Sequence, residues 1–393
     1  MSLAELSTVS SPERLRVYPE EDAGHRRTGR VRSKAALVAV DLVLLAVGIA
    51  SALLFAIPGT PPVTSDPAPA STLSTAEAFA PTRDLISDPF VLPTPQLDYM
   101  YSSGPGGVGQ PHLPERTFTV LGQFLSLNDA MPTLPSWVEP NTGLWAPDVR
   151  HVGRNYVMWF TGKDRDDMLP TGAPAECIGL ATSASPTGPF TSRSSTPAIC
   201  QTSQYGDIDP RTLTTANGQQ WLYWKNDGNA DNSFPTRIYA QRLAADGQTR
   251  IGATSVLLAN DLPWEGHLIE APDMVQVGHR YLLFFAGNAS WADDSGIGLA
   301  LCKGPGGPCS SPYAGPWLGS NVQGAGPGEE TVYSQNGITW MLYTPHGLYY
   351  FLALPELAAA RIAFTPTGLP YVADRQGMVP GVTAGLNGQV GQR

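Results

Sequence analysis

Five short acidic stretches recur along this chain at intervals of 59 to 61 residues, and this repeat limits the possible folds more than any other feature. Each stretch precedes two short runs of β-branched and aromatic residues with a turn between them, which is the pattern of a β-hairpin. The acidic residues that mark the repeat are Asp88, Asp148, Asp209, Glu270 and Glu329. Five copies of an all-strand unit at a fixed period predict an all-β fold, a five-bladed β-propeller.

The place of the acidic residues within the repeat predicts a functional site. A carboxylate that opens the first strand of each blade is expected to point toward the central axis, so five such loops build one acidic pocket. Glu270 also has Trp264 and Pro272 close to it in the sequence. Apolar surroundings disfavour the charged form of a carboxyl group and raise its pKa, as a general acid working near neutral pH requires.

Four of these stretches resemble, in order and in spacing, the motif series of glycoside hydrolase family 43. The resemblance covers roughly Asp84 to Tyr371. The motifs that carry it are Ser87-Asp88-Pro89-Phe90, Trp145-Ala146-Pro147-Asp148-Val149, Ile208-Asp209-Pro210 and Ile269-Glu270-Ala271-Pro272. It implies a five-bladed propeller that hydrolyses arabinose- or xylose-containing polysaccharides or oligosaccharides with inversion of configuration.

The resemblance also implies roles for three carboxyl groups. Glu270 would be the general acid, Asp88 the general base, and Asp209 the residue that tunes and orients the acid. Asp84 competes for the base role, and Asp207 competes for the role of Asp209. For each of them the structural alternative is a turn residue whose side chain bonds to nearby backbone amides. Asp148 and Asp273 have similar settings, and we expect them to have that structural role.

Four further residues are candidates for substrate binding at the pocket mouth: Trp145, Trp264, His267 and Glu329. An aromatic face stacks well on a sugar ring, although a tryptophan is equally expected in a core. Family members often have a histidine after Gly-Pro-Gly in the fifth blade, near a central calcium ion or water, where this chain has Glu329. The resemblance therefore raises one cofactor, a structural calcium ion at the propeller centre, and leaves its presence open; no metal ligand is assigned.

An apolar segment near the N-terminus predicts a membrane anchor. The run from Ala35 to Ile57 has 23 residues and is apolar except for Asp41 and Ser51. At about 1.5 Å per residue it spans roughly 34 Å, enough to cross a hydrocarbon core of about 30 Å. Basic residues crowd the preceding segment, so the positive-inside rule places the N-terminus in the cytoplasm and the remainder outside. A cleaved signal peptide, whose apolar region is normally shorter, is the alternative.

The predicted organisation has five parts: a cytoplasmic tail at 1–34, a transmembrane helix at 35–57, a Pro-, Ser- and Ala-rich linker at 58–83, a propeller hydrolase domain at 84–375 and a C-terminal tail at 376–393. The chain has four cysteines, all beyond the linker. An even number outside the cytoplasm favours disulfides. Local pairing, of Cys177 with Cys200 and of Cys302 with Cys309, is the simplest of the three possible pairings.

The net charge of −10 argues against nucleic acid or an anionic surface as a partner and fits a neutral glycan. The sequence thus predicts a membrane-anchored, extracytoplasmic glycoside hydrolase of the cell envelope, with the lipid bilayer as its second partner. Arabinofuranose in an envelope polysaccharide is the preferred substrate; the exact sugar, the linkage and endo or exo action stay open. One alternative is a non-catalytic glycan-binding propeller at the cell surface. Another is a propeller enzyme that transfers a sugar to phosphate or to a second sugar.

Overall fold

The computed structural model describes residues 86–118, 125–230, 234–290, 292–320, 325–346 and 357–377. The predicted transmembrane helix at 35–57 and the linker at 58–83 lie outside these ranges. In the part of the chain that is described, no helix is both long and apolar enough to span a bilayer.

The described strands form five sheets in which every neighbouring pair is antiparallel. We call these sheets blades 1 to 5. Blade 1 contains β1 (Phe90–Pro93), β2 (Asp98–Tyr101), β3 (Pro114–Phe118) and β4 (Asn128–Asp129). Blade 2 contains β5 (Trp145–Val152), β6 (Asn155–Met168) and β7 (Pro174–Ser183). Blade 3 contains β8 (Asp207–Thr214), β9 (Gln220–Asn226), β10 (Arg237–Leu243) and β11 (Arg250–Ala259).

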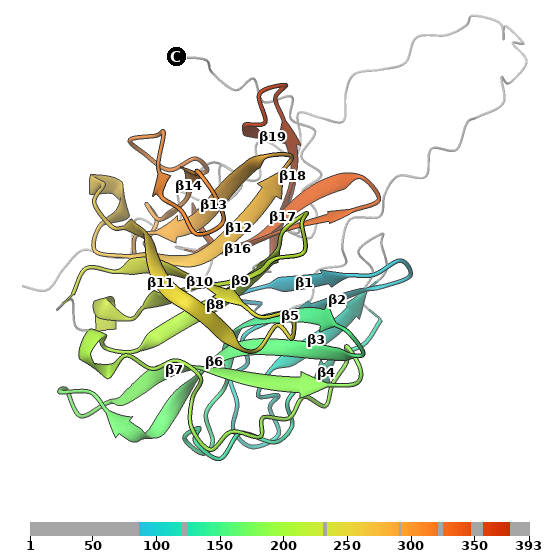
Figure 1. Cartoon of the computed structure of the whole chain (residues 1–393), viewed down its shortest axis with the longest axis vertical. Helices are drawn as coiled ribbons and strands as arrows, with labels where there is room; N and C mark the ends of the chain where they lie inside the picture. Colours follow the sequence, from blue (N-terminus) through green and yellow to red (C-terminus); the bar gives the residue numbers. More distant parts are fainter. Residues whose placement is uncertain are drawn as a thin grey trace, which may run out of the picture. The chain divides into compact units, whose positions relative to one another are not determined.

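Blade 4 contains β12 (Ile269–Val277), β13 (Arg280–Gly287), β14 (Gly296–Cys302) and β15 (Cys309–Ser310). Blade 5 contains β16 (Ala325–Gln335), β17 (Ile338–His346), β18 (Ala358–Phe364) and β19 (Pro370–Gly377). Short 3-10 helices occupy loops between strands: η1 (Thr202–Gln204), η2 (Gly228–Ala230) and η3 (Pro263–Glu265). Figure 1 shows the blades following one another around the molecule, from cyan β1 to red β19.

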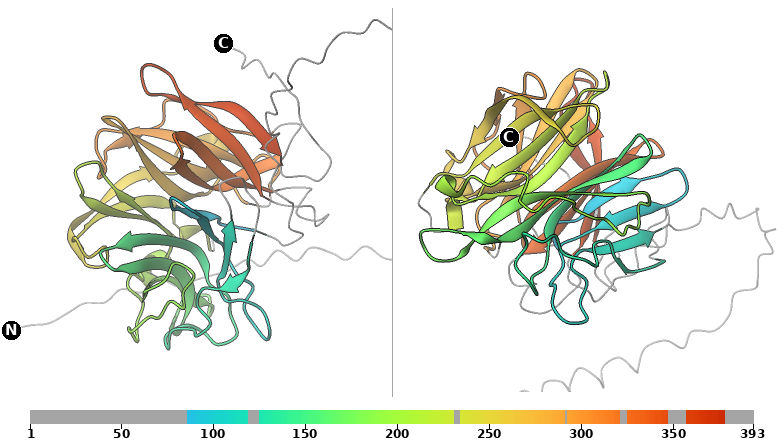
Figure 2. Two further views of the ribbon diagram at one scale, coloured as in Figure 1. Left: turned by 90° about the vertical axis from the view of Figure 1, so that its right-hand side faces the viewer. Right: turned by 60° about the horizontal axis from the view of Figure 1, so that its bottom comes forward.

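The first strand of each blade lines the central axis. β1 contacts β5, β5 contacts β8, β8 contacts β12, β12 contacts β16, and β16 returns to β1. The other strands of each blade lie outward from this ring, as the two further views in Figure 2 show. The predicted five-bladed propeller is therefore confirmed.

The second strands are buried on both faces, because each blade packs between two others. In β13 the run Leu282 to Phe285 is fully buried. Successive side chains of this strand contribute to two different apolar clusters, one against blade 3 and one against blade 5. Close packing of this kind requires small residues beside large ones. A Cβ atom placed on Gly298 of β14 would lie 2.3 Å from the Phe285 ring.

Polar side chains close the ring between blades 5 and 1. The Gln335 amide donates a hydrogen bond of 2.6 Å to the Asp98 carboxylate. The Thr344 hydroxyl donates one of 3.3 Å to the carbonyl of Ile86. Among the described strands, each of the five sheets is built from one continuous stretch of sequence, so closure depends on contacts between blades.

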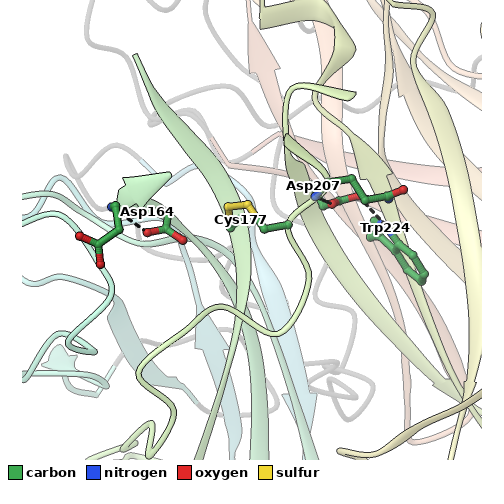
Figure 3. The surroundings of a disulfide bond; sticks show 7 residues. Asp164, Cys177, Asp207 and Trp224 are labelled. Atoms are coloured by element: carbon green, nitrogen blue, oxygen red, sulfur yellow. Dashed lines mark hydrogen bonds between the residues drawn. A yellow bond between two sulfur atoms is a disulfide. The ribbon is translucent and has the colours of Figure 1, made fainter. Parts of the chain in front are cut away.

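The two disulfides have the predicted local pairing. Cys177 of β7 pairs with Cys200, and Cys302 of β14 pairs with Cys309 of β15. They lie in blades 2 and 4, as expected. Figure 3 shows the first disulfide beside the start of β8, where blade 3 begins.

Candidate active site

Five non-glycine residues with positive φ mark equivalent corners at the start of the first strands. Their φ values lie between +46° and +57°, a region that non-glycine residues seldom adopt and that costs on the order of 1–3 kcal/mol per residue. Such strain is often concentrated at functional sites. The corner residues, one from each blade, are Asp88, Ala146, Asp209, Ala271 and Glu329. The sequence repeat therefore has a counterpart in the backbone.

The structure corrects the expectation that the acidic residue marking each repeat points into one central pocket. Each corner from blade 2 to blade 5 coincides with a shift in strand register. Asp148 therefore lies two residues beyond its corner and accepts hydrogen bonds from the backbone N–H and hydroxyl of Thr212 in blade 3. Asp273 likewise accepts from the N–H of Val332 in blade 5, at 2.6 Å. Both aspartates tie one blade to the next, so they are structural as expected, but their partners lie in the neighbouring blade and not in their own turn.

Asp88 lies at the corner of blade 1 and is held by hydroxyl groups. Its Oδ2 accepts from the hydroxyl of Ser103 and, at 3.1 Å, from that of Ser87. Its backbone N–H donates to the Glu329 carboxylate at 3.1 Å. Burial raises the pKa of Asp88 well above its usual value, and the charges of Glu329 and Asp209 raise it further. The Ser103 hydrogen bond and the Arg211 charge oppose this rise.

Asp209 lies at the corner of blade 3 and connects blades 2, 3 and 4. Its backbone N–H donates to the Thr161 hydroxyl at 3.2 Å. Its Oδ2 accepts from the N–H of Ala271 at 3.1 Å, and Ala271 directly follows Glu270. Burial raises the pKa of Asp209, whereas the charge of Lys225 opposes the rise. This network fixes the carboxylate beside the start of β12.

Glu270 lies one residue before the corner of blade 4, beside a buried lysine. The Lys225 ammonium is fully buried and donates to Oε2 of Glu270 at 3.3 Å. The same ammonium is 3.5 Å from the Asp227 carboxylate. Burial raises the pKa of Glu270 to about 7; Lys225 opposes this shift, and Asp209 adds to it. Glu270 can therefore hold or release a proton near neutral pH.

The structure brings four predicted carboxyl groups together at the ends of the first strands. Asp88 is affected by the charges of Glu329 and Asp209, and Glu270 by those of Asp209 and Asp88. Burial raises the pKa of Glu329 to about 7, and the charge of Glu270 adds to that rise. Because like charges repel in a buried site, ionisation of one of the four groups disfavours ionisation of the others. Such a site can donate one proton and accept another.

Asp207, the rival for the role of Asp209, is committed to structural hydrogen bonds. Its carboxylate accepts from the backbone N–H of Gln201 at 2.6 Å and from the side-chain amide of the same residue at 2.7 Å. It also accepts from the Trp224 indole N–H at 2.9 Å, drawn as a dashed line between the two labelled residues in Figure 3. This arrangement holds the chain just after Cys200 onto blade 3. Asp84, the rival for the base role, lies outside the described residues.

The four predicted substrate-binding residues have different surroundings. Trp145 is half-buried at the start of β5, one residue before the corner of blade 2, which is the place that Glu270 takes in blade 4. Trp264 packs against Phe285 in the apolar cluster between blades 3 and 4, with ring centres 5.9 Å apart, which favours its role in the core. His267 is exposed on the loop before β12. Glu329 is half-buried and bonds to the corner of blade 1.

Arg211 is a buried residue whose guanidinium bonds to three other blades, at or just before their first strands. It donates to the backbone carbonyls of Pro147 at 3.1 Å, Pro89 at 3.0 Å and Glu330 at 3.3 Å. Each of these residues directly follows the corner of its blade, so one side chain joins blades 1, 2 and 5 at the centre. We call this arrangement the Arg211 hub.

The residues at the hub do not fit a calcium ion. Calcium requires six to eight oxygen ligands, and the three axial carbonyl oxygens here already accept hydrogen bonds from a cation. Neither carboxyl oxygen of Glu330 bonds to another residue, and burial raises its pKa well above the usual value, which disfavours the ionised form that a metal ion would require. Among the described residues, one group of three or more possible metal-ligating side chains is compact enough to hold an ion, and two of its members are the bonded cysteines of blade 2.

Sequence reasoning missed Lys225 and Arg211. Lys225 ends an apolar run at the end of β9, and a lysine that continues such a run is a signal for a buried, paired charge. Arg211 lies two residues beyond the corner of blade 3, in the place that Asp148 and Asp273 take in blades 2 and 4. Alignment of the repeats by Pro147, Pro210 and Pro272 would have placed Arg211 opposite Asp148 and Asp273, a cation among anions.

Comparisons with known proteins agree with this geometry. Residues 83–370 match the family model described as glycosyl hydrolases family 43. A thermostable family-43 glycoside hydrolase has a similar structure, with a TM-score of 0.62 and 22% identity over 74% of this chain and 94% of that one. An endo-1,4-beta-xylanase from Bacteroides thetaiotaomicron has a TM-score of 0.61 and 18% identity, over 74% of this chain and 94% of that one. An exo-1,5-alpha-L-arabinanase from a bovine ruminal metagenomic library has a TM-score of 0.56 and 17% identity, over 74% of this chain and 97% of that one. No curated protein sequence matches the chain significantly.

Proposed function

This chain belongs to glycosyl hydrolase family 43, and from that premise we propose that it hydrolyses arabinose- or xylose-containing glycans with inversion of configuration. The observation that carries the proposal is the convergence of Asp88, Asp209 and Glu270, from three different blades, in one buried site with shifted pKa values. An inverting glycosidase needs one protonated and one ionised carboxyl group on opposite faces of the sugar ring.

In the proposed reaction Glu270 is the general acid. The Lys225 ammonium donates to Oε2 of Glu270, so the proton to be transferred is on Oε1. Glu270 gives this proton to the oxygen of the leaving sugar as the glycosidic bond breaks. A pKa of about 7 suits this role, because the group is protonated in part of the site population and is still a strong enough acid to donate.

Asp88 is the general base in this proposal. Its carboxylate takes a proton from a water molecule, whose oxygen attacks the anomeric carbon from the face opposite the leaving group. Ser103 and Ser87 both donate to the same oxygen, Oδ2, which leaves Oδ1 to receive the proton. Water is thereby added across the glycosidic bond, and the proton on Asp88 later returns to solvent.

Asp209 positions Glu270 and sets its proton affinity. It accepts from the N–H of Ala271, the next residue after Glu270, and its negative charge raises the pKa of the acid. Asp209 and Lys225 act on Glu270 in opposite directions. The balance between them keeps the pKa of Glu270 near neutrality instead of at the extremes that burial or a lone ion pair would produce.

The sugar class is proposed from the comparisons. The similar structures are named as an endo-1,4-beta-xylanase and an exo-1,5-alpha-L-arabinanase, and both sugars are five-carbon units. Trp145 lies one residue before the corner of blade 2 and is the aromatic side chain best placed to stack on a sugar ring.

The test is hydrolysis of a panel of arabinose- and xylose-based glycans by the full chain and by Glu270→Gln and Asp88→Asn variants. We expect release of sugar by the parent and a loss of kcat of at least about 1,000-fold in both variants, with unchanged circular dichroism. Near-parental turnover in either folded variant would refute its role. Tight sugar binding by the parent without any product would favour the glycan-binding alternative.

We also propose that residues 35–57 anchor the catalytic domain at the outer face of a membrane. The two disulfides in the domain support this location, because disulfides persist mainly in oxidising compartments. The test is membrane fractionation of cells that express the full chain and a variant starting at Thr82. Recovery of the full chain in the soluble fraction would contradict the proposal.

A further inference from the structure

We propose that the Arg211 guanidinium is the built-in cation of this propeller: it joins blades 1, 2 and 5 at the centre and supplies there the positive charge for which the resemblance raised a calcium ion. This inference rests on the proposed function for the role of Asp88. It goes beyond that function by assigning the charge at the hub to a side chain.

Arg211 donates to carbonyls of three blades other than its own, and each carbonyl belongs to the residue after a corner. The planar guanidinium has five donors in a fixed arrangement, so it can bind several acceptors at once, which a lysine cannot do. It also lies over the Phe90 ring, 5.2 Å from its centre, next to the corner of blade 1. The side chain therefore fixes the distances between corners.

The charge of Arg211 lies among buried carboxyl groups. Asp88, Asp209, Glu270 and Glu329 interact electrostatically with one another. The Arg211 charge lowers the proton affinity of Asp88, Asp209, Asp273 and Glu330. Lys225 contacts Glu270 at 3.3 Å, and its charge also acts on Asp209. Of the two buried cations, one is therefore bonded to the proposed acid and the other to the carbonyl of Pro89, the residue after the proposed base.

A guanidinium group is effectively always protonated, and a side chain cannot be removed by a chelator. A site that holds this side chain on its axis has its counter-charge without a metal. The hub is therefore a positioning element, because Arg211 acts on Asp88 through the backbone and through its charge.

The test compares three variants of the full chain: Arg211→Met, Arg211→Lys and Arg150→Met. Lysine keeps the charge but not the three carbonyl contacts, so it separates the two functions of Arg211. Arg150 is a matched control, since it lies over the same Phe90 ring at 5.1 Å and bonds to Thr212 and Asp148, away from Asp88.

The pH dependence of activity gives the first readout. In Arg211→Met we expect the acidic limb of the kcat/KM profile to move up by about one pH unit, because Asp88 then binds a proton more tightly. This corresponds to a roughly tenfold lower kcat/KM at pH values below the limb. Arg211→Lys keeps the position of the limb, and so does Arg150→Met. An unchanged limb in a folded Arg211→Met variant overturns the proposal.

The melting temperature gives a second readout that does not need activity. Without the Arg211 charge the buried carboxyl groups hold their protons to higher pH. Groups with such raised pKa values make the folded protein less stable as pH rises. We expect the loss of Tm in Arg211→Met to be greater at pH 8 than at pH 5. The difference between the two pH values should be smaller in Arg150→Met, because Arg211 lowers the pKa of Asp273 more than Arg150 does and also acts on Asp88. Equal losses for Arg211→Met would mean that its hydrogen bonds alone matter, and the charge assignment would be wrong.

Metal addition and removal give the third readout. We expect neither a chelator nor millimolar calcium to change the Tm or the kcat of the parent protein. A Tm that falls with the chelator and recovers with calcium overturns the inference. If the parent hydrolyses no glycan, the proposed function fails, whereas the Tm measurements still decide the role of Arg211.

Discussion

Replacement of Lys225 by methionine removes the one ammonium group in contact with the proposed acid. Its Nζ is 3.3 Å from Oε2 of Glu270, and the lysine is fully buried. At an effective dielectric constant of about 20, two unit charges at this distance attract by about 5 kcal/mol. Asp227 shares the same ammonium, so only part of this energy acts on Glu270. We expect the pKa of Glu270 to rise by about 1–3 units above its value of about 7.

The assay is the pH dependence of kcat/KM in Lys225→Met. Because Glu270 must be protonated to act as an acid, the basic limb of the profile should move up by the same 1–3 units. The unfolding free energy should also fall, by roughly 3–5 kcal/mol near neutral pH, since a buried ion pair loses one partner. This loss should grow as pH rises, because a group with a raised folded pKa destabilises the protein once the unfolded form ionises.

Lys163→Met is the matched control for this experiment. Lys163 is half-buried and pairs across the strands with Glu176, and it does not contribute to the pKa of Glu270. Its removal should leave the basic limb in place. A basic limb that stays fixed, or moves to lower pH, in a folded Lys225→Met variant would refute the assignment of Glu270 as the acid that Lys225 controls.

Three further predictions concern stability. Asp148→Ala should lower the unfolding free energy by about 1–3 kcal/mol, measured by urea titration, because the buried N–H of Thr212 loses its acceptor; a kcat that falls with it would contradict the structural role. Gly298→Ala should cost about 1–3 kcal/mol by the same titration, since its Cβ would lie 2.3 Å from the Phe285 ring; a neutral result would show that the ring can move. Burial raises the pKa of Asp98 to about 6, whereas its pKa in the unfolded chain is about 4. The protein therefore loses stability as pH rises between these two values. Asp98→Asn should therefore raise Tm relative to the parent more at pH 8 than at pH 4, and the reverse order would contradict the pKa shift.

The fold could be predicted from the sequence because each repeat begins with an acidic residue and has a turn between its two strand runs. Hairpin patterns at a fixed interval allow few architectures, and the local disulfides follow from cysteines that flank single turns. Asp88, Asp209 and Glu270 could be selected because their order matched a family series. Their convergence depends on the ring of first strands, which brings residues more than 60 positions apart to one end of the axis.

The direction in which each side chain points could not be predicted, because it depends on the positive-φ corner residues. A positive-φ residue shifts the register of the first strand, so Asp148 turns away from the pocket and bonds to blade 3. Nothing in the spacing of acidic residues reveals this shift. The same applies to Asp207 and Asp209, which are two positions apart in one strand and have different partners. Sequence alone does not show which carboxylate bonds to Gln201, before its own strand, and which bonds to Ala271 in the next blade.

The acidic pattern of the sequence does not indicate the two buried cations, Lys225 and Arg211. A search for acidic groups alone describes a pocket with more negative charge than a buried site can hold. Lys225 and Arg211 offset that charge, and each lies on a strand of blade 3. Blade 3 therefore supplies both the tuning carboxylate, Asp209, and the two cations that act on the proposed acid and base.

The central claim is that Glu270 and Asp88 act from opposite faces of the sugar in a single displacement. Proton NMR of the first anomer released, recorded during hydrolysis of a glycoside of defined configuration, tests it most directly. The account predicts that the initial product has the anomeric configuration opposite to that of the substrate, with the other anomer appearing later by mutarotation. A product that first appears with the configuration of the substrate would mean a covalent intermediate and would contradict the assignment of Asp88 as a base.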